Sequence, residues 1–134
     1  MRFEIEAPLE SAGYCHCTRC QRRTGTASSA QARVPADALR IVAGKQHLRS
    51  YAPPDGGFVK EFCGVCGSSL FSRHPDDSST MAVRLGAFDG DPGIRPTLRQ
   101  WVGSAAAWEA IPDDGLPRYE GPRPGVTWLA PSAA

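Results

Sequence analysis

The chain has 134 residues, which is enough for one domain and short for two. A hydrophobic fraction of 41%, a charged fraction of 22% and a net charge of +1 are ordinary for a globular protein and argue against a general nucleic-acid-coating role. No run approaches the roughly 20 apolar residues that cross a bilayer, and the N-terminus lacks the apolar core of a secretory signal. We therefore expect a cytoplasmic protein with no membrane partner.

The predicted elements are short strands, as 14 glycines and 12 prolines favour. Polar and apolar residues alternate over residues 2–7, which predicts a half-buried strand. A short helical turn is predicted at 18–23, and Gly25 is expected to end it. Further strands are predicted at 27–34, 39–42, 47–51, 58–62, 69–73, 81–85 and 97–102, with turns or loops at 35–38, 53–57 and 89–96. Past Pro112 we expect an irregular tail that wraps the body of one mainly-β domain, residues 1–134.

The five cysteines are the most informative residues, because they fall into two tight groups. Their number is odd and no export signal precedes them, so they do not indicate a disulfide framework. Clustered cysteines are typical of metal ligands that folding brings together, and zinc is the predicted ion. The groups are Cys15, Cys17 and Cys20, and Cys63 and Cys66.

The first group places three thiolates within six residues. Residues 15 and 17 of an extended strand point to the same face, and a following turn would bring Cys20 round to them. Three ligands leave one tetrahedral position open, as in a catalytic zinc site. The alternative is a four-ligand structural site that this group shares with Cys63 and Cys66.

The second group is a Cys-x-x-Cys followed by Gly67. Gly64 and Gly67 allow the positive φ angles that a metal-binding knuckle needs. Redox chemistry at the same spacing is a second interpretation, and unrelated buried cysteines are a third. The strand predicted directly afterwards favours metal, because redox motifs of this type usually open a helix.

Basic residues and a histidine accompany the first group. His16 lies between two ligand cysteines and should point away from them, so we expect a surface or outer group rather than a ligand. Arg19, Arg22 and Arg23 form either a solvated basic face or a positive potential that lowers thiolate pKa values and attracts an anionic ligand. Both interpretations stay open at this point.

Several motifs together resemble one known family, the glutathione-dependent formaldehyde-activating enzymes, which include centromere protein V. The resemblance spans nearly the whole chain in the family's order. It is carried by Cys15-His16-Cys17-x-x-Cys20, Arg22-Arg23-Thr24-Gly25, Phe62-Cys63-x-x-Cys66-Gly67-Ser68-x-Leu70-Phe71, residues 85–89, Trp101, Trp108 and residues 113–119.

The resemblance implies a fold of stacked small antiparallel sheets, a β-tent, organised around zinc. In the family pattern the cysteines matching Cys15, Cys17 and Cys20 hold a reactive zinc. Those matching Cys63 and Cys66 give half of a structural site, and an N-terminal Cys-x-Cys gives the other half. This sequence lacks that N-terminal pair. We therefore expect a weak or vacant second site, total zinc nearer one than two, and a Cys63–Cys66 pair open to oxidation.

The function that the resemblance implies is zinc-dependent carbon–sulfur lyase chemistry on an adduct of glutathione or another small thiol, of the S-hydroxymethylglutathione class. Cys15, Cys17 and Cys20 would form the catalytic zinc site, and Arg19, Arg22 and Arg23 would pair with substrate carboxylates. The alternative is a non-catalytic zinc- or thiol-binding or protein-interaction module on the same fold. A nucleic-acid partner is disfavoured by the net charge of +1, and self-association is left open.

Overall fold

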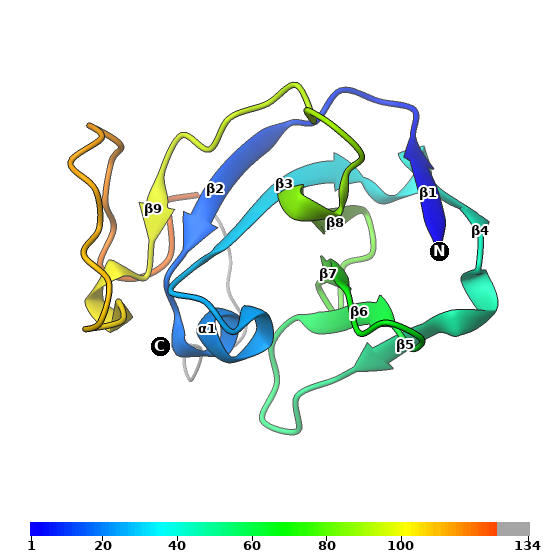
Figure 1. Ribbon diagram of the computed structural model, residues 1–134, viewed down its shortest axis with the longest axis horizontal. Coiled ribbons are helices and arrows are strands. Elements are labelled where there is room, and N and C mark those ends of the chain that lie inside the picture. Colours follow the sequence, from blue (N-terminus) through cyan, green and yellow to red (C-terminus); the bar gives the residue numbers. More distant parts are fainter. Residues whose placement is uncertain (126–134) are drawn as a thin grey trace.

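Short strands form one large sheet and one small sheet in the computed structural model, which describes residues 1–125 (Figure 1). The large sheet has the order β5-β6-β7-β8-β3-β2-β9, and β1 pairs with β4 in the small sheet. The strands are β1 (Arg2–Ile5), β2 (Ser11–Cys15), β3 (Ser29–Pro35), β4 (Leu39–Ala43), β5 (Leu48–Tyr51), β6 (Val59–Cys63), β7 (Ser69–Arg73), β8 (Thr80–Arg84) and β9 (Arg99–Gln100). The helical elements are α1 (Thr18–Thr24) and the 3₁₀ turns η1 (Ala36–Ala38), η2 (Lys45–His47), η3 (Leu85–Ala87) and η4 (Val102–Ser104).

Among the named strands of residues 1–125, pairing is antiparallel except between β2 and β9, which run parallel. The β2–β3 register places Ser11 opposite Arg33 at one end and Cys15 opposite Ser29 at the other. The β2–β9 register places Cys15 beside Gln100. Segments far apart in the sequence therefore meet at the end of β2 that carries the first cysteine.

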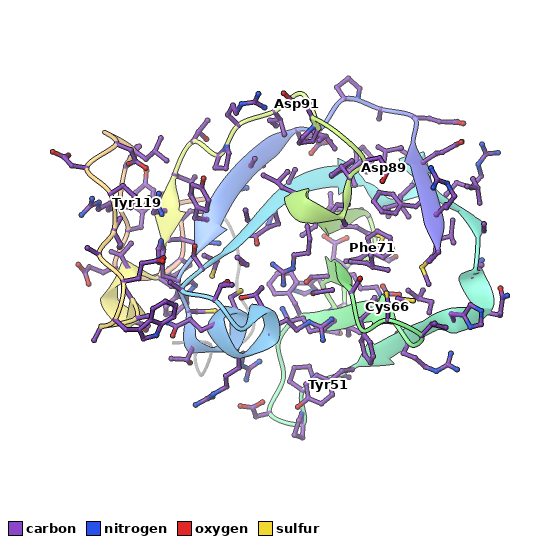
Figure 2. The ribbon with its side chains drawn as sticks, viewed as in Figure 1. Tyr51, Cys66, Phe71, Asp89, Asp91 and Tyr119 are labelled. Carbon is purple, nitrogen blue, oxygen red and sulfur yellow. The ribbon has the colours of Figure 1, made fainter. Side chains whose placement is uncertain are left out.

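The two faces of the large sheet differ in chemistry. One face packs an apolar cluster of Val34, Cys63, Leu70, Phe71 and Val83 against the small sheet. The Phe3 ring of β1 meets the Phe71 ring edge-on with their centroids 5.2 Å apart, and Phe71 is 1% exposed (Figure 2). Residues one position away in each strand point to the opposite face, because strand side chains alternate. That opposite face lines the cavity described below.

The C-terminal segment is irregular, as predicted, and runs beside β9. Backbone N–H groups of Arg99 and Trp101 donate to the carbonyls of Pro117 and Gly121 over 2.9 and 2.8 Å, and Tyr119 donates to Arg99 over 2.9 Å. These hydrogen bonds hold residues 117–121 against the large sheet (Figure 1). The remainder of the predicted tail, residues 126–134, lies outside the described residues.

The predicted mainly-β class with small antiparallel sheets is confirmed, and individual elements show why some boundaries shift. The helical turn extends to Thr24 and ends at Gly25, whose φ of 69° is left-handed, as expected. The strand predicted over 97–102 shortens to Arg99–Gln100, because Trp101 takes a left-handed φ of 57° and η4 follows. Strand β2 begins at Ser11, ahead of the cysteines, where no strand was predicted. Within residues 1–125, no helix has the length and apolar character to span a membrane.

Candidate metal centre

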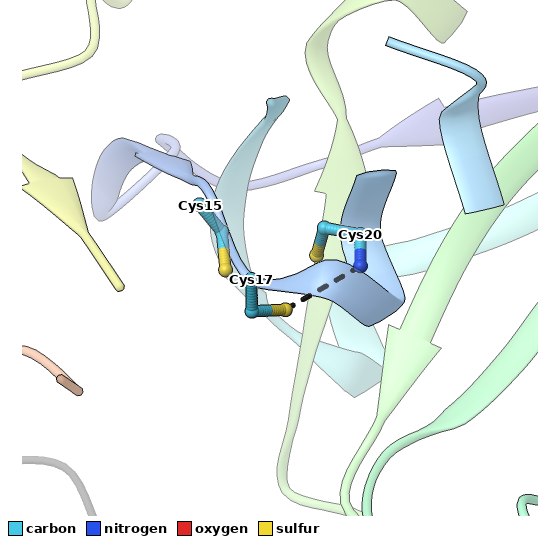
Figure 3. A group of neighbouring side chains, drawn as sticks. All are labelled: Cys15, Cys17 and Cys20. Carbon is cyan, nitrogen blue, oxygen red and sulfur yellow. Dashed lines mark hydrogen bonds between the residues drawn. The ribbon is translucent and has the colours of Figure 1, made fainter. Parts of the chain in front are cut away.

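Three cysteine sulfurs converge where β2 passes into α1 (Figure 3). Cys15 ends β2, Cys17 is the extended residue that caps α1, and Cys20 lies in the first turn of the helix. The backbone N–H of Cys20 donates to the Cys17 sulfur over 3.4 Å, which closes that turn. All three sulfurs lie within 4.8 Å of one another, and the residues are 4%, 4% and 7% exposed.

This donor set fits a thiophilic metal ion. Tetrahedral coordination with metal–sulfur bonds of about 2.3 Å separates two sulfurs by about 3.8 Å, which is compatible with sulfurs that all lie within 4.8 Å of one another. Among residues 1–125, this is the one group of three or more cysteine, histidine or acidic side chains arranged in this way. The sequence predicted that the turn after Cys17 brings Cys20 back to Cys15 and Cys17, and the positions of the three sulfurs confirm this arrangement.

The three sulfurs share their protons unequally. Hydrogen bonds from Cys15 and Cys17 lower the pKa of Cys20 well below its usual value. The same contacts with Cys17 and Cys20, together with burial, raise the pKa of Cys15. At Cys17 the bond to Cys15 lowers the pKa, but the bond to Cys20 and burial outweigh it and the net direction is upward. Without metal, Cys15 and Cys17 therefore hold their protons more tightly than Cys20, and a bound ion must displace those two protons.

A cavity of about 90 Å³ opens beside the cysteines, along the polar face of the large sheet. Its apolar walls include Phe58, Leu98 and Trp101. Its charged residues are all basic, and no aspartate or glutamate within residues 1–125 lines it. These basic residues are Arg19, Arg33, Lys60, Arg84 and Arg123.

Of the three arginines predicted to bind substrate, one lines this cavity. Arg19 lines the cavity. Its guanidinium forms an ion pair with Asp55 at 2.7 Å and donates a hydrogen bond to the Gly56 carbonyl over 2.6 Å. Arg22 is exposed and lies outside the cavity lining. Arg23 donates to the Glu61 carbonyl over 3.3 Å and lines a different pocket, near Cys63. The structure therefore does not gather the three arginines around one ligand position.

Four cavity cations were not singled out from the sequence. They are Arg33 on β3, Lys60 on β6, Arg84 on β8 and Arg123 in the C-terminal segment. Arg84 is 8% exposed and donates to Gln31 over 2.7 Å, and burial lowers the pKa of Lys60. The available signal was strand alternation, in which Arg33 and Arg84 are each flanked by apolar residues. That pattern assigns them to a polar face but does not say that the face encloses a cavity.

The second cysteine pair has different surroundings. Cys63 is 4% exposed within the apolar cluster, whereas Cys66 is exposed in the β6–β7 turn (Figure 2). The Cys66 sulfur lies 3.1 Å from the Ser68 hydroxyl, and that hydrogen bond is the main reason why the pKa of Cys66 falls to about 7. Within residues 1–125 no third ligand joins the pair, and the structure keeps the pair apart from Cys15, Cys17 and Cys20. Metal binding at Cys63 and Cys66 stays a prediction.

His16 is buried rather than placed at the surface, and it belongs to a polar network behind the candidate metal ligands Cys15 and Cys17. It is 3% exposed, and its Nε2 lies 3.2 Å from an Arg99 guanidinium nitrogen. Arg99 also pairs with Asp114 at 2.8 Å and stacks over the Tyr14 ring with 4.2 Å to its centroid. Burial, and then the charge of Arg99, lower the pKa of His16. This network ties β2, β9 and the C-terminal segment together directly behind Cys15 and Cys17.

Comparison with known proteins bears on the fold and on the family of this chain. A crystal structure of a Rhodobacter sphaeroides protein is similar in fold, with a TM-score of 0.55 and 21% sequence identity over 87% of this chain and 89% of that chain. No curated protein matches the chain. The family model described as glutathione-dependent formaldehyde-activating enzyme (GFA) matches residues 1–104, which is well over half of the chain. The protein therefore belongs to the GFA family.

Proposed function

We propose that this protein is a zinc-dependent enzyme of the carbon–sulfur lyase type that acts on an adduct of glutathione and formaldehyde. The reaction joins the thiol sulfur to the carbonyl carbon to give S-hydroxymethylglutathione, or cleaves that bond in the reverse direction. The observation that carries the proposal is the buried three-sulfur cluster at the wall of a cavity whose charged residues are all basic. Family membership, which implies a glutathione-linked reaction, supports it.

Cys15, Cys17 and Cys20 would hold the zinc. An ion bound there would supply Lewis-acid activation of a substrate thiol. The chain's own contribution is to place three sulfurs in a fixed array, since β2 positions Cys15 and the first turn of α1 positions Cys20. The network of Arg99, His16 and Asp114 stiffens that array from behind.

The cavity residues bind and orient the substrate in this proposal. Lys60 and Arg84 act electrostatically on the cysteine sulfurs, and they balance the negative charge that three thiolates bring to the site. Arg19 is held at the wall by Asp55 and offers positive potential to a carboxylate. Phe58 and Trp101 limit water beside the reacting sulfur, which strengthens these charge interactions.

The test measures the rate at which glutathione and ¹³C-formaldehyde form S-hydroxymethylglutathione. NMR exchange spectroscopy monitors this rate in the presence of the zinc-loaded protein. We expect exchange above the uncatalysed rate for the wild type and for Cys66→Ser, and the uncatalysed rate for Cys17→Ser. Circular dichroism of Cys17→Ser would establish that the variant is folded.

Two results would contradict the enzyme proposal. Wild-type protein that leaves the exchange rate unchanged while binding glutathione would identify a thiol-binding module instead. Cys17→Ser protein that keeps the wild-type rate would remove the three-cysteine cluster from the reaction.

A further inference from the structure

The five cavity cations divide into those that act on the cysteine sulfurs and those that do not. Arg84 helps to lower the pKa of Cys20, and the cysteine charges act on the Lys60 ammonium. Arg19 has its own partner in Asp55. Arg33 and Arg123 are the remaining two, and the charge of Arg33 acts on Arg123. Neither arginine is among the main causes of the pKa shifts of Cys15, Cys17 and Cys20.

Arg33 and Arg123 meet at the far end of β2. Arg33 lies opposite Ser11 in the β2–β3 register, and an Arg123 guanidinium nitrogen donates to the Ser11 hydroxyl over 3.4 Å. The backbone N–H of Arg123 donates to the Gln100 side chain over 3.1 Å, which anchors the C-terminal segment there. Ser11, Gly13 and Cys15 all line the cavity from one face of β2. Four residues of extended strand separate the Cα atoms of Ser11 and Cys15 by about 13 Å.

Within the part of the chain that the structure describes, the pair of guanidiniums has no acidic partner. No carboxylate of residues 1–125 lines the cavity, and neither arginine forms an ion pair with any of these residues. Asp77 feels the charge of Arg33, but it is exposed in the turn before β8 and outside the cavity. Burial, and then the charge of Arg33, lower the pKa of Arg123. Two half-buried like charges held together are unfavourable, and a bound anion would relieve both.

We infer that Arg33 and Arg123 form a subsite for a carboxylate of the thiol substrate, at the opposite end of the cavity from the metal centre. This inference rests on the proposed function and sharpens it. Even after the reach of the arginine side chains is subtracted, a Cα separation of about 13 Å exceeds the distance between the thiol and the carboxylate of a single cysteine, so the subsite selects a peptide-sized thiol over a cysteine-sized one. Arg123 lies beyond the 104 residues that the family model matches, so the C-terminal segment supplies this selectivity.

The experiment measures calorimetric binding of S-methylglutathione to the zinc-loaded protein. This probe keeps both carboxylates but has no free thiol, so its binding does not depend on zinc–sulfur chemistry. We expect Arg33→Gln and Arg123→Gln each to weaken binding about tenfold, as loss of a charge-assisted hydrogen bond does. Arg22→Gln, an exposed control on α1, should stay within about twofold of the wild type, because isolated surface charges contribute little. The diethyl ester of the probe has no free carboxylate, so it should bind equally weakly to the wild type and to the three variants.

Three results would overturn the subsite: wild-type protein that binds no S-methylglutathione, both variants binding as tightly as the wild type, or the ester binding as tightly as the acid. Thermal melting verifies that each variant is folded. If Arg33→Gln does not fold, the binding of S-methylglutathione to Arg123→Gln alone decides whether the subsite exists. Failure of the proposed function has a different signature, namely carboxylate-dependent binding by a wild type that does not accelerate the exchange with formaldehyde.

Discussion

The two cysteine groups contain similar motifs and end in opposite environments. In the first, a strand end and a helix turn bring three buried sulfurs within 4.8 Å of one another. In the second, a tight turn between β6 and β7 leaves Cys63 in the apolar core and Cys66 exposed. The contrast teaches that a Cys-x-x-Cys spacing positions two sulfurs, while a metal centre also needs the chain to deliver a third donor to the same point.

The electrostatic settings differ in the same way. The first group is flanked by Lys60 and Arg84 and supported from behind by the His16–Arg99–Asp114 network. The second is governed by one neighbour, the Ser68 hydroxyl. The first group is therefore suited to hold an ion, and the second presents one free thiol, Cys66, at the surface.

The largest expected effect is on metal content. Cys17→Ser should lower bound zinc by about one equivalent, because two remaining sulfurs are too few for tight binding. Cys66→Ser, the matched control from the second group, should leave zinc content unchanged. Plasma mass spectrometry of the purified proteins measures both, and an equal loss in the two variants would remove the distinction between the groups.

The next effect is on the pH dependence of zinc affinity. The raised pKa values of Cys15 and Cys17 keep both protonated at neutral pH, so zinc must displace two protons. Affinity should therefore rise with pH, with a slope of log K against pH of about two. Chelator competition at several pH values measures that slope, and a flat profile would show that the cluster is already deprotonated.

A several-fold effect is expected in thiol reactivity. Because the pKa of Cys66 is about 7, iodoacetamide should label Cys66 before the four buried cysteines, with a half-maximal rate near pH 7. Ser68→Ala should raise that pKa and slow labelling at pH 7, since it removes the main hydrogen bond to the sulfur. Peptide mass spectrometry identifies the labelled residue, and unchanged kinetics in Ser68→Ala would contradict this account.

The smallest effect concerns the network behind the first group. Asp114→Asn should lower Tm, because Arg99 loses its ionised partner. The hydrogen bond from Arg99 lowers the pKa of Asp114 below that of a free aspartate, so the stabilising contribution is present above the unfolded-state pKa and is lost as pH falls through the folded-state pKa. The Tm difference between wild type and variant should thus shrink in acid, while at any one pH the labelling rate of Cys66 should be the same in the two proteins. A constant difference down to low pH would show that the ion pair is not its origin.

Local sequence determined much of the fold and of the metal centre. The spacing of Cys15, Cys17 and Cys20 was enough to predict their convergence, because a strand and one helical turn fix the directions of nearby side chains. Gly25 marked the end of α1 for the same local reason, since its left-handed φ is freely available to glycine. Alternation of polar and apolar residues likewise indicated a mainly-β chain. Each of these properties depends on residues within a few positions of one another.

Tertiary structure alone decided what surrounds those ligands. The cations Arg33, Lys60, Arg84 and Arg123 come from three strands and the C-terminal segment, and only strand pairing across the sheet brings them to one cavity. His16 becomes buried because β9, far along the chain, pairs in parallel with β2 and delivers Arg99. Strand periodicity states which residues share a face, but long-range pairing determines whether that face meets solvent, core or a ligand.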